Sequence, residues 1–135
     1  MATLANVRAG LLTRLQTITG VRAYSKWPDQ IVTPAAMVRR MGSMPYTTFS
    51  GNGAHRFEIV AAVQLTDLER AQAALDLYTD LSGDDSIVAA LEGDETLDGN
   101  AEYILLGDWS EDESVMIGTI EYLTATLPVE VHIAK

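Results

Sequence analysis

Apolar residues near the start of the chain recur at steps of three and four between Thr3 and Thr19, with Arg8 and Arg14 between them. This spacing predicts an amphipathic helix. Gly20 is expected to end that helix. The apolar residues would face a core and the arginines would face solvent.

Further along, apolar and polar residues alternate. The alternation from Arg56 to Leu65 predicts a strand with one face on a core. Residues 34–40 predict a second strand and residues 21–24 a short third one. Residues 41–54 contain three glycines and one proline, and are expected to form a long loop.

Two helices are predicted in the middle of the chain. Residues 66–69 read Thr-Asp-Leu-Glu, the spacing of a capping box, with Thr66 as the cap of a helix that runs to about Leu81. A short helix from Ile87 to Glu92 should follow. Its candidate caps are Asp84, Asp85 and Ser86.

The last third reads as strands at residues 101–109 and 114–126, joined by an acidic turn at 110–113. Pro128 is expected to break the pattern, and residues 129–133 read as another strand or as a bent continuation at a sheet edge. The element order predicts a single α+β domain over residues 1–135. Its sheet should be mostly antiparallel, with an N-terminal helix and a central helix pair packed on one face.

Composition narrows the class of protein. With 135 residues, of which 47% are hydrophobic and 21% charged, the chain fits one globular domain. It contains no cysteine, which excludes disulfides and thiolate metal sites. No stretch reaches the roughly 20 apolar residues of a membrane span, and Arg8 and Arg14 interrupt the apolar start, unlike a signal peptide. We expect a cytoplasmic chain with no membrane partner.

The net charge of −10 is unevenly distributed. Residues 1–57 hold seven basic residues and one acid, whereas residues 58–135 hold eighteen acids and two basic residues. An overall negative charge argues against nucleic-acid binding by the whole surface. Separate basic and acidic regions would favour head-to-tail pairing of copies or docking on a charged partner. The alternative is that the two halves interleave in the fold.

The sequence offers little catalytic chemistry. A serine triad needs a histidine beside a hydroxyl. His55 is interpreted as a polar residue at a loop end, and His132 as a solvent-facing strand position. Residues 94–99 resemble part of an EF-hand loop, but Thr96 and Leu105 occupy positions that require calcium ligands. We therefore expect a turn there, no metal, no cofactor and no enzyme activity.

The 41–54 loop and its flanks are rich in the residue types that gather in protein interfaces. An aromatic and basic platform for single-stranded nucleic acid is the alternative. We favour a subunit or partner contact because the chain is acidic. The expected contact residues are Arg39, Arg40, Met44, Tyr46, Phe49 and Arg56.

Two sequence blocks resemble small tail terminator proteins of long, non-contractile-tailed phages. The first block comprises residues 24–31 (YSKWPDQI), 34–36 (PAA) and 46–49 (YTTF). The second comprises residues 67–72 (DLERAQ), 75–76 (LD), 82–92 (SGDDSIVAALE) and 96–97 (TL). The resemblance covers about residues 22–97 and fades after Gly99. Its motifs are structural, and none is catalytic.

The resemblance implies a structural virion protein at the head-tail interface, assembled in the host cytoplasm. Six copies would form a ring on the head-proximal end of the tail tube. The ring would contact the major tail tube protein and the head-tail connector or stopper protein, and double-stranded DNA would pass through it without specific binding. Acids expected to face this lumen are Asp84, Asp85, Asp94, Glu95 and Asp98.

Two alternatives stay open. Another head-tail joining protein, such as a stopper or a neck or completion protein, could share the same structural motifs. A small ligand-binding α+β domain would place a pocket between sheet and helices, but the sequence shows no convergent polar cluster for one.

Overall fold

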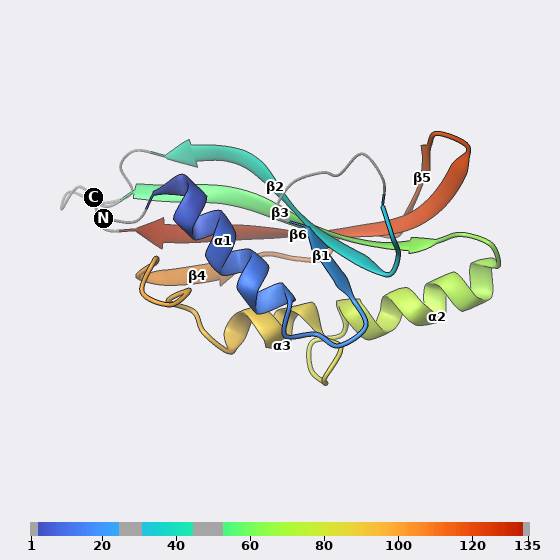
Figure 1. Ribbon diagram of the computed structural model, residues 1–135, viewed down its shortest axis with the longest axis horizontal. Helices are drawn as coiled ribbons and strands as arrows, with labels where there is room; N and C mark the ends of the chain where they lie inside the picture. The colour runs from blue at the N-terminus through green and yellow to red at the C-terminus, as the bar shows by residue number, and fades with distance from the viewer. Residues whose placement is uncertain (1–2, 25–30, 45–52, 134–135) are drawn as a thin grey trace.

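The computed structural model describes residues 3–24, 31–44 and 53–133 (Figure 1). Within these residues the chain forms three helices and six strands. In chain order they are α1 (Leu4–Leu15), β1 (Arg22–Tyr24), β2 (Ala35–Met44), β3 (Gly53–Gln64), α2 (Leu68–Thr79), α3 (Ile87–Glu92), β4 (Tyr103–Leu106), β5 (Glu113–Ile117) and β6 (Ile120–Ile133).

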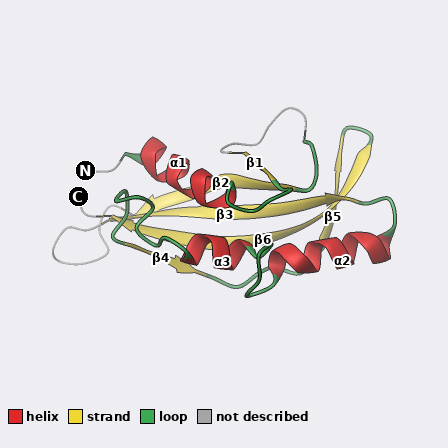
Figure 2. Ribbon diagram, turned by 60° about the horizontal axis from the view of Figure 1, so that its bottom comes forward, coloured by secondary structure: helices red, strands yellow, loops and turns green. Residues whose placement is uncertain are grey.

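The strands form one sheet in the order β1-β2-β3-β6-β4, and β5 also pairs with β6. Only the β1–β2 pair is parallel among the pairs described. The helices lie on one face of the sheet (Figure 2). This confirms the predicted α+β class with a mostly antiparallel sheet, and the parallel edge strand makes the sheet mixed.

The core lies between the sheet and the helices. β3 supplies Phe57, Ile59, Ala61 and Val63, the alternate positions that the sequence predicted to face a core. Side chains of all three helices pack against them in one continuous cluster. Central members that are at most 1% exposed include Leu11, Leu15, Leu75, Leu91 and Leu127.

The helix boundaries follow local capping. Asp67, rather than the predicted Thr66, caps α2, because its side chain accepts a hydrogen bond from the Glu69 amide at 3.1 Å. α2 ends at Thr79, before the predicted Leu81. The predicted α3 is confirmed, and Ser86 is its cap. α1 is shorter than the apolar pattern suggested and ends at Leu15.

Pro128 does not break the C-terminal strand, so of the two alternatives residues 129–133 are a continuation and not a separate strand. β6 runs through it from Ile120 to Ile133. The Pro128 carbonyl accepts a hydrogen bond from the Gly107 amide, on the side of β6 where β4 lies. In an antiparallel sheet the N and C=O of one residue point the same way, so the Pro128 nitrogen also faces this side. Gly107 lies between β4 and β5, where the ladder is interrupted, and the missing N–H therefore costs no ladder bond. Gly107 also permits close approach, since an added Cβ would lie 3.1 Å from the Pro128 Cβ.

The expected single strand over residues 114–126 is instead a hairpin. β5 and β6 pair from Glu113–Thr124 to Ile117–Ile120. Gly118 has a φ of 64°, a left-handed conformation that suits glycine in a tight turn. The hairpin projects from one end of the sheet (Figure 1).

The expected loop over residues 41–54 is partly strand. β2 continues to Met44 and β3 begins at Gly53. A bulge between Arg40 and Gly42 shifts the register of this pair. Residues 45–52 lie outside the described residues.

Candidate functional site

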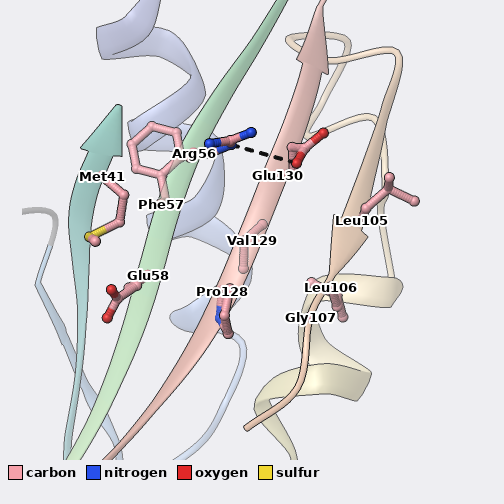
Figure 3. Close-up of a pocket in the computed structure, with 10 residues that line it drawn as sticks. All are labelled: Met41, Arg56, Phe57, Glu58, Leu105, Leu106, Gly107, Pro128, Val129 and Glu130. Carbon is pink, nitrogen blue, oxygen red and sulfur yellow. Dashed lines mark ion pairs between the residues drawn. The ribbon is translucent and has the colours of Figure 1, made fainter. Parts of the chain in front are cut away.

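The sheet face opposite the helices carries a shallow hollow of about 460 Å³ (Figure 3). Its lining comes from β2, β3, β6 and the region of β4. Met41, Leu105 and Pro128 supply apolar surface, and Arg56, Glu58 and Glu130 supply charge. Met41 and Leu105 are 54% and 53% exposed. An apolar hollow beside charged side chains is the usual composition of a protein-protein contact.

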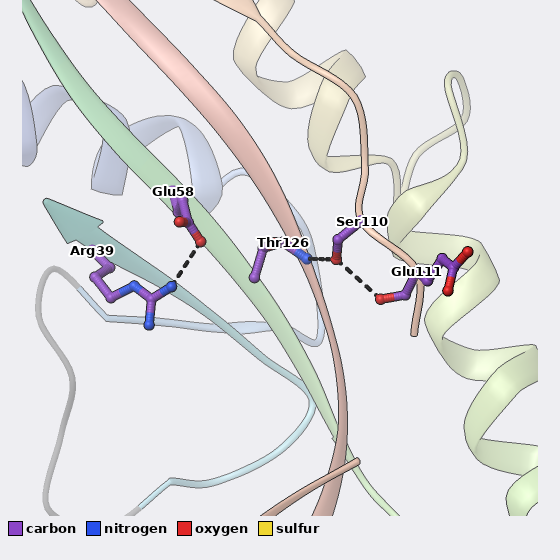
Figure 4. Close-up of polar contacts among 5 residues, drawn as sticks. All are labelled: Arg39, Glu58, Ser110, Glu111 and Thr126. Atoms are coloured by element: carbon purple, nitrogen blue, oxygen red, sulfur yellow. Dashed lines mark hydrogen bonds and ion pairs between the residues drawn. The ribbon is translucent and has the colours of Figure 1, made fainter. Parts of the chain in front are cut away.

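Two ion pairs cross neighbouring strands on this open face. The Arg39 Nη2 lies 2.7 Å from the Glu58 Oε2 (Figure 4). The Arg56 Nε lies 3.8 Å from the Glu130 Oε2 (Figure 3). Both pairs are partly exposed, so water and salt weaken them. These two ion pairs therefore orient the charged side chains on the open face but contribute little to the stability of the fold.

His132 is buried, at 7% exposure, and the predicted solvent-facing position is wrong. β4 lies directly beside it, and the Tyr103 ring stacks on the imidazole with centroids 4.4 Å apart. The His132 Nε2 lies 2.7 Å from the Glu130 Oε1. The sequence pattern missed this because alternation shows which face of a strand a residue lies on. It does not show that a neighbouring strand, here β4, brings a side chain over that residue.

The structure separates the basic residues predicted to form one contact. Arg39 and Arg56 lie on the open face with Glu58. Arg40 pairs with Phe57, a core residue, and therefore lies on the helix side of the sheet. Met44 is the last residue of β2. Two further residues of the predicted contact, Tyr46 and Phe49, lie outside the described residues.

His55 is a strand residue of β3, which corrects its interpretation as a loop end. Its Nδ1 lies 2.6 Å from the Ser43 Oγ on β2. Burial, with a smaller contribution from the positive charge of Arg40, lowers the pKa of His55 below its ordinary value of 6.5. No acid orients this pair in the described contacts of His55, so the arrangement lacks the third group of a hydrolytic triad.

The five acids expected to face a lumen gather around α3. Asp84 and Asp85 precede that helix, and Asp94, Glu95 and Asp98 follow it. More broadly, residues 67–98 hold ten acids and one arginine. In Figure 1, α2 and α3 lie on the side of the molecule away from β2. The uneven distribution of charge along the sequence therefore places many acids on and around α2 and α3. Arg39 and Arg56 lie on the open face of the sheet.

Asp94 organises a turn. Its carboxylate accepts hydrogen bonds from the Thr96 hydroxyl at 2.7 Å and from the Asp98 amide at 2.9 Å. These bonds lower the pKa of Asp94, the Thr96 hydroxyl contributing most. Leu97 and Asp98 adopt left-handed conformations within the turn, and the Leu97 side chain is buried. Asp94 therefore has a structural task, as a turn between α3 and β4 requires.

The β5–β6 hairpin is a surface that sequence reasoning missed. Met116 is 62% exposed and Ile120 is 42% exposed, although both are large apolar residues. Gly118-Thr119 between two apolar runs was the signal that could have revealed the hairpin.

Other chemistry is scarce in the described part of the chain. Among residues 3–24, 31–44 and 53–133, no group of three or more histidine, aspartate or glutamate side chains is placed to hold a metal. No helix of these ranges combines the length and the apolar character needed to cross a bilayer. Three surfaces of the described residues are distinct: the open sheet face, the hairpin and the acidic side around α2 and α3.

Comparisons with known proteins do not add a family. No protein-family model matches the sequence, and no curated protein matches it significantly.

Proposed function

We propose that this chain is a structural subunit of a phage virion that forms a ring on the head-proximal end of a tail tube. The ring ends tube polymerisation and joins the tail to the head connector. The resemblance over residues 22–97 motivates this function. The observation that carries it is the presence of unlike surfaces on one small subunit.

A closed ring needs two different contact patches on each subunit, because each copy meets its two neighbours through different surfaces. The open sheet face and the β5–β6 hairpin are two such patches, and they differ in shape and charge. The acidic side around α3 supplies a third. An acidic wall would repel DNA phosphates and let the duplex slide through without sticking.

The chain would then require no cofactor and no catalytic group. Its partners would be copies of itself, the tail tube protein and the connector or stopper. A stopper or neck protein is the second candidate, since both kinds of protein join rings. The charged side chains of the hollow are engaged in the Arg39–Glu58 and Arg56–Glu130 ion pairs, which disfavours a ligand-binding domain.

Deletion of the gene in its phage tests the proposal. Lysates of infected cells would be inspected by negative-stain electron microscopy and the tail lengths measured. Overlong tubes without heads are expected. Tails of normal length beside filled heads would move the chain to the connector side of the joint, and intact infectious particles would refute both roles.

The loop contact has its own test. Replacing Tyr46 and Phe49 by serine should leave a folded subunit that no longer joins tails, as complementation of the deletion would measure. Normal complementation would refute a contact role for this segment.

The lumen assignment is tested through exposed acids only. Asp84→Asn with Glu95→Gln removes two charges and leaves the Asp94 turn intact. We expect normal ring assembly and slower DNA release from the particle. A structure of the assembled ring with a net basic lumen would refute the assignment.

A further inference from the structure

The β5–β6 hairpin projects beyond β3. β3 ends its pairing with β6 at Gln64–Tyr122, and the Leu65 amide still bonds the Glu121 carbonyl, so residues 116–120 extend past it. Within this extension Met116 is 62% exposed and Ile120 is 42% exposed. Met116 pairs with Glu121 and Ile117 with Ile120, so the two pairs face opposite sides of the hairpin. Both sides therefore present apolar surface to water, which is a usual sign of an interaction site.

The hollow on the open face offers a matching apolar surface. Met41, Leu105 and Pro128 line it, and all three are exposed. Figure 3 shows these side chains arranged around Arg56 and Glu130. The Arg56–Glu130 ion pair lies in the middle of the hollow, and Met41 and Leu105 flank it on the two outer strands. Apolar residues on both flanks suit a hairpin that carries apolar residues on both of its sides.

The charges of the two surfaces are complementary. Residues 108–121 contain no basic residue and five acids: Asp108, Glu111, Asp112, Glu113 and Glu121. The open face carries arginines on three adjacent strands, Arg22, Arg39 and Arg56, against the two glutamates Glu58 and Glu130. An acidic hairpin approaching this face meets a surface with a small positive excess, which favours the encounter.

The hairpin cannot reach the hollow of its own chain. Ile120 and Pro128 belong to the same continuous strand, β6, and eight residues of strand separate them by roughly 26 Å. The strand pairs with β3 along this stretch and cannot fold back. Only another copy of the chain can bring a hairpin with this sequence to the hollow.

We infer that the β5–β6 hairpin of one copy seats in the open-face hollow of a second copy. The hairpin tip enters between the flanks of the hollow, so that Met116 on one side and Ile120 on the other contact Met41 and Leu105. The hairpin acids lie beside the arginines of the open face. The contact joins unlike surfaces, so repetition produces a closed ring or an open chain of subunits. The inference names the subunit contact of the ring and, for its biological setting, rests on the proposed function.

Cysteine cross-linking tests the contact directly, because the chain has no cysteine of its own. Ile120→Cys and Leu105→Cys are prepared as separate variants, one with a size tag, then mixed and oxidised. A mixed disulfide dimer should form on a non-reducing gel, because a disulfide needs Cα atoms within about 7 Å. Leu77→Cys changes a residue on α2 that is 54% exposed, somewhat more than the 42% of Ile120. It replaces Ile120→Cys in the control and should give no enrichment of mixed dimer.

Self-association provides the second readout. Met116→Asp with Ile120→Asp places charge where the inference puts apolar contact. The change should weaken association about tenfold or more, as light scattering after size exclusion would measure. Leu77→Asp serves as the matched surface change and should leave association unaltered. Circular dichroism establishes that each variant is folded.

The possible results separate the contact from the phage role. An oligomer that persists in the hairpin variant, or shows no mixed cross-link, overturns this contact and leaves tail termination open. A chain that stays monomeric at every concentration also overturns it. Specific cross-linking together with normal tails in the gene deletion would support the contact and refute the proposed function.

Discussion

The two faces of the central sheet are built from the same strands but have different compositions. On β3 the helix-covered face carries Phe57, Ile59 and Ala61, all of them buried. The open face of the same strand carries Arg56 and Glu58 and ends at the exposed Gln64. The covered face has apolar side chains packed on helices, whereas the open face has charges in ion pairs beside a hollow and, further along, a small buried apolar cluster of Met37, Val60 and Ala62. The comparison indicates that the covered face holds the fold together and that the open face is available for contacts.

Replacing neighbouring residues on the two faces should give the largest difference in stability. Phe57→Ala removes a side chain that is 1% exposed and should lower the free energy of unfolding by about 3–5 kcal/mol. Arg56→Ala, one residue away on the open face, should cost at most about 1 kcal/mol. Urea unfolding followed by circular dichroism measures both. Equal losses of unfolding free energy in the two variants would contradict the conclusion that the covered face stabilises the fold and the open face does not.

A single methyl group added on the helix-covered side should also lower the free energy of unfolding. In Gly10→Ala the new Cβ would lie 2.9 Å from the Leu97 Cβ, so α1 or the Asp94 turn must shift. The expected loss is about 1–3 kcal/mol, although alanine is the better helix former. Thermal and urea unfolding would measure it.

The control for this prediction uses the conformation of Leu97. Its φ is 49°, which glycine adopts without strain. In a Leu97→Gly background the Cβ at 2.9 Å is absent and only the approach to the backbone oxygen of residue 97, at 3.3 Å, remains. The loss caused by Gly10→Ala should then be much smaller. A loss of the same size in both backgrounds would show that the contact is not the cause.

Sequence patterns predicted the covered face better than the open one. Alternation identified the inward residues of β3, and the bounds predicted for α3, Ile87 to Glu92, are correct, because burial and capping are local rules. The β5–β6 hairpin was missed, and the continuity of β6 through Pro128 was left as one of two alternatives. Both depend on which strand lies alongside: Pro128 is tolerated only because its nitrogen faces the interruption beside Gly107.

The candidate site was predicted less well for the same reason. Arg39, Arg40 and Arg56 looked like one basic cluster in the sequence, but neighbouring residues of a strand point to opposite faces. Arg40 therefore lies apart from the other two. The five acids around α3 are near one another because they flank a single short helix, which the sequence already placed. Sequence patterns thus located charged residues that belong to one helix or strand. They did not predict which charged residues of different strands lie on the same face.

The ion pairs on the open face should contribute little to folding. A double-mutant cycle with Arg39→Gln and Glu58→Gln should give a coupling energy below about 1 kcal/mol, because the arginine side chain is 50% exposed. The coupling should decrease further with added salt. A coupling of several kcal/mol that ignores salt would mean that the open face also stabilises the fold.

The smallest expected effect lies on the covered side and depends on pH. Burial and the charge of Arg40 lower the pKa of His55 below 6.5 in the folded protein. The unfolded chain therefore binds a proton more readily, and stability falls as the pH drops below about 6.5, levelling off below the folded pKa. His55→Gln should flatten this part of the pH dependence.

Proton NMR of the His55 ring gives the folded pKa directly. Arg40→Gln should move it part of the way back toward 6.5, since one of the two causes is removed and burial remains. The open-face variant Arg39→Gln is the matched control, because Arg39 neighbours Arg40 in sequence but lies across the sheet. Equal shifts in both variants would mean that the two faces are not electrically distinct at this point, whereas a shift in Arg40→Gln alone would extend the difference between the faces from packing to charge.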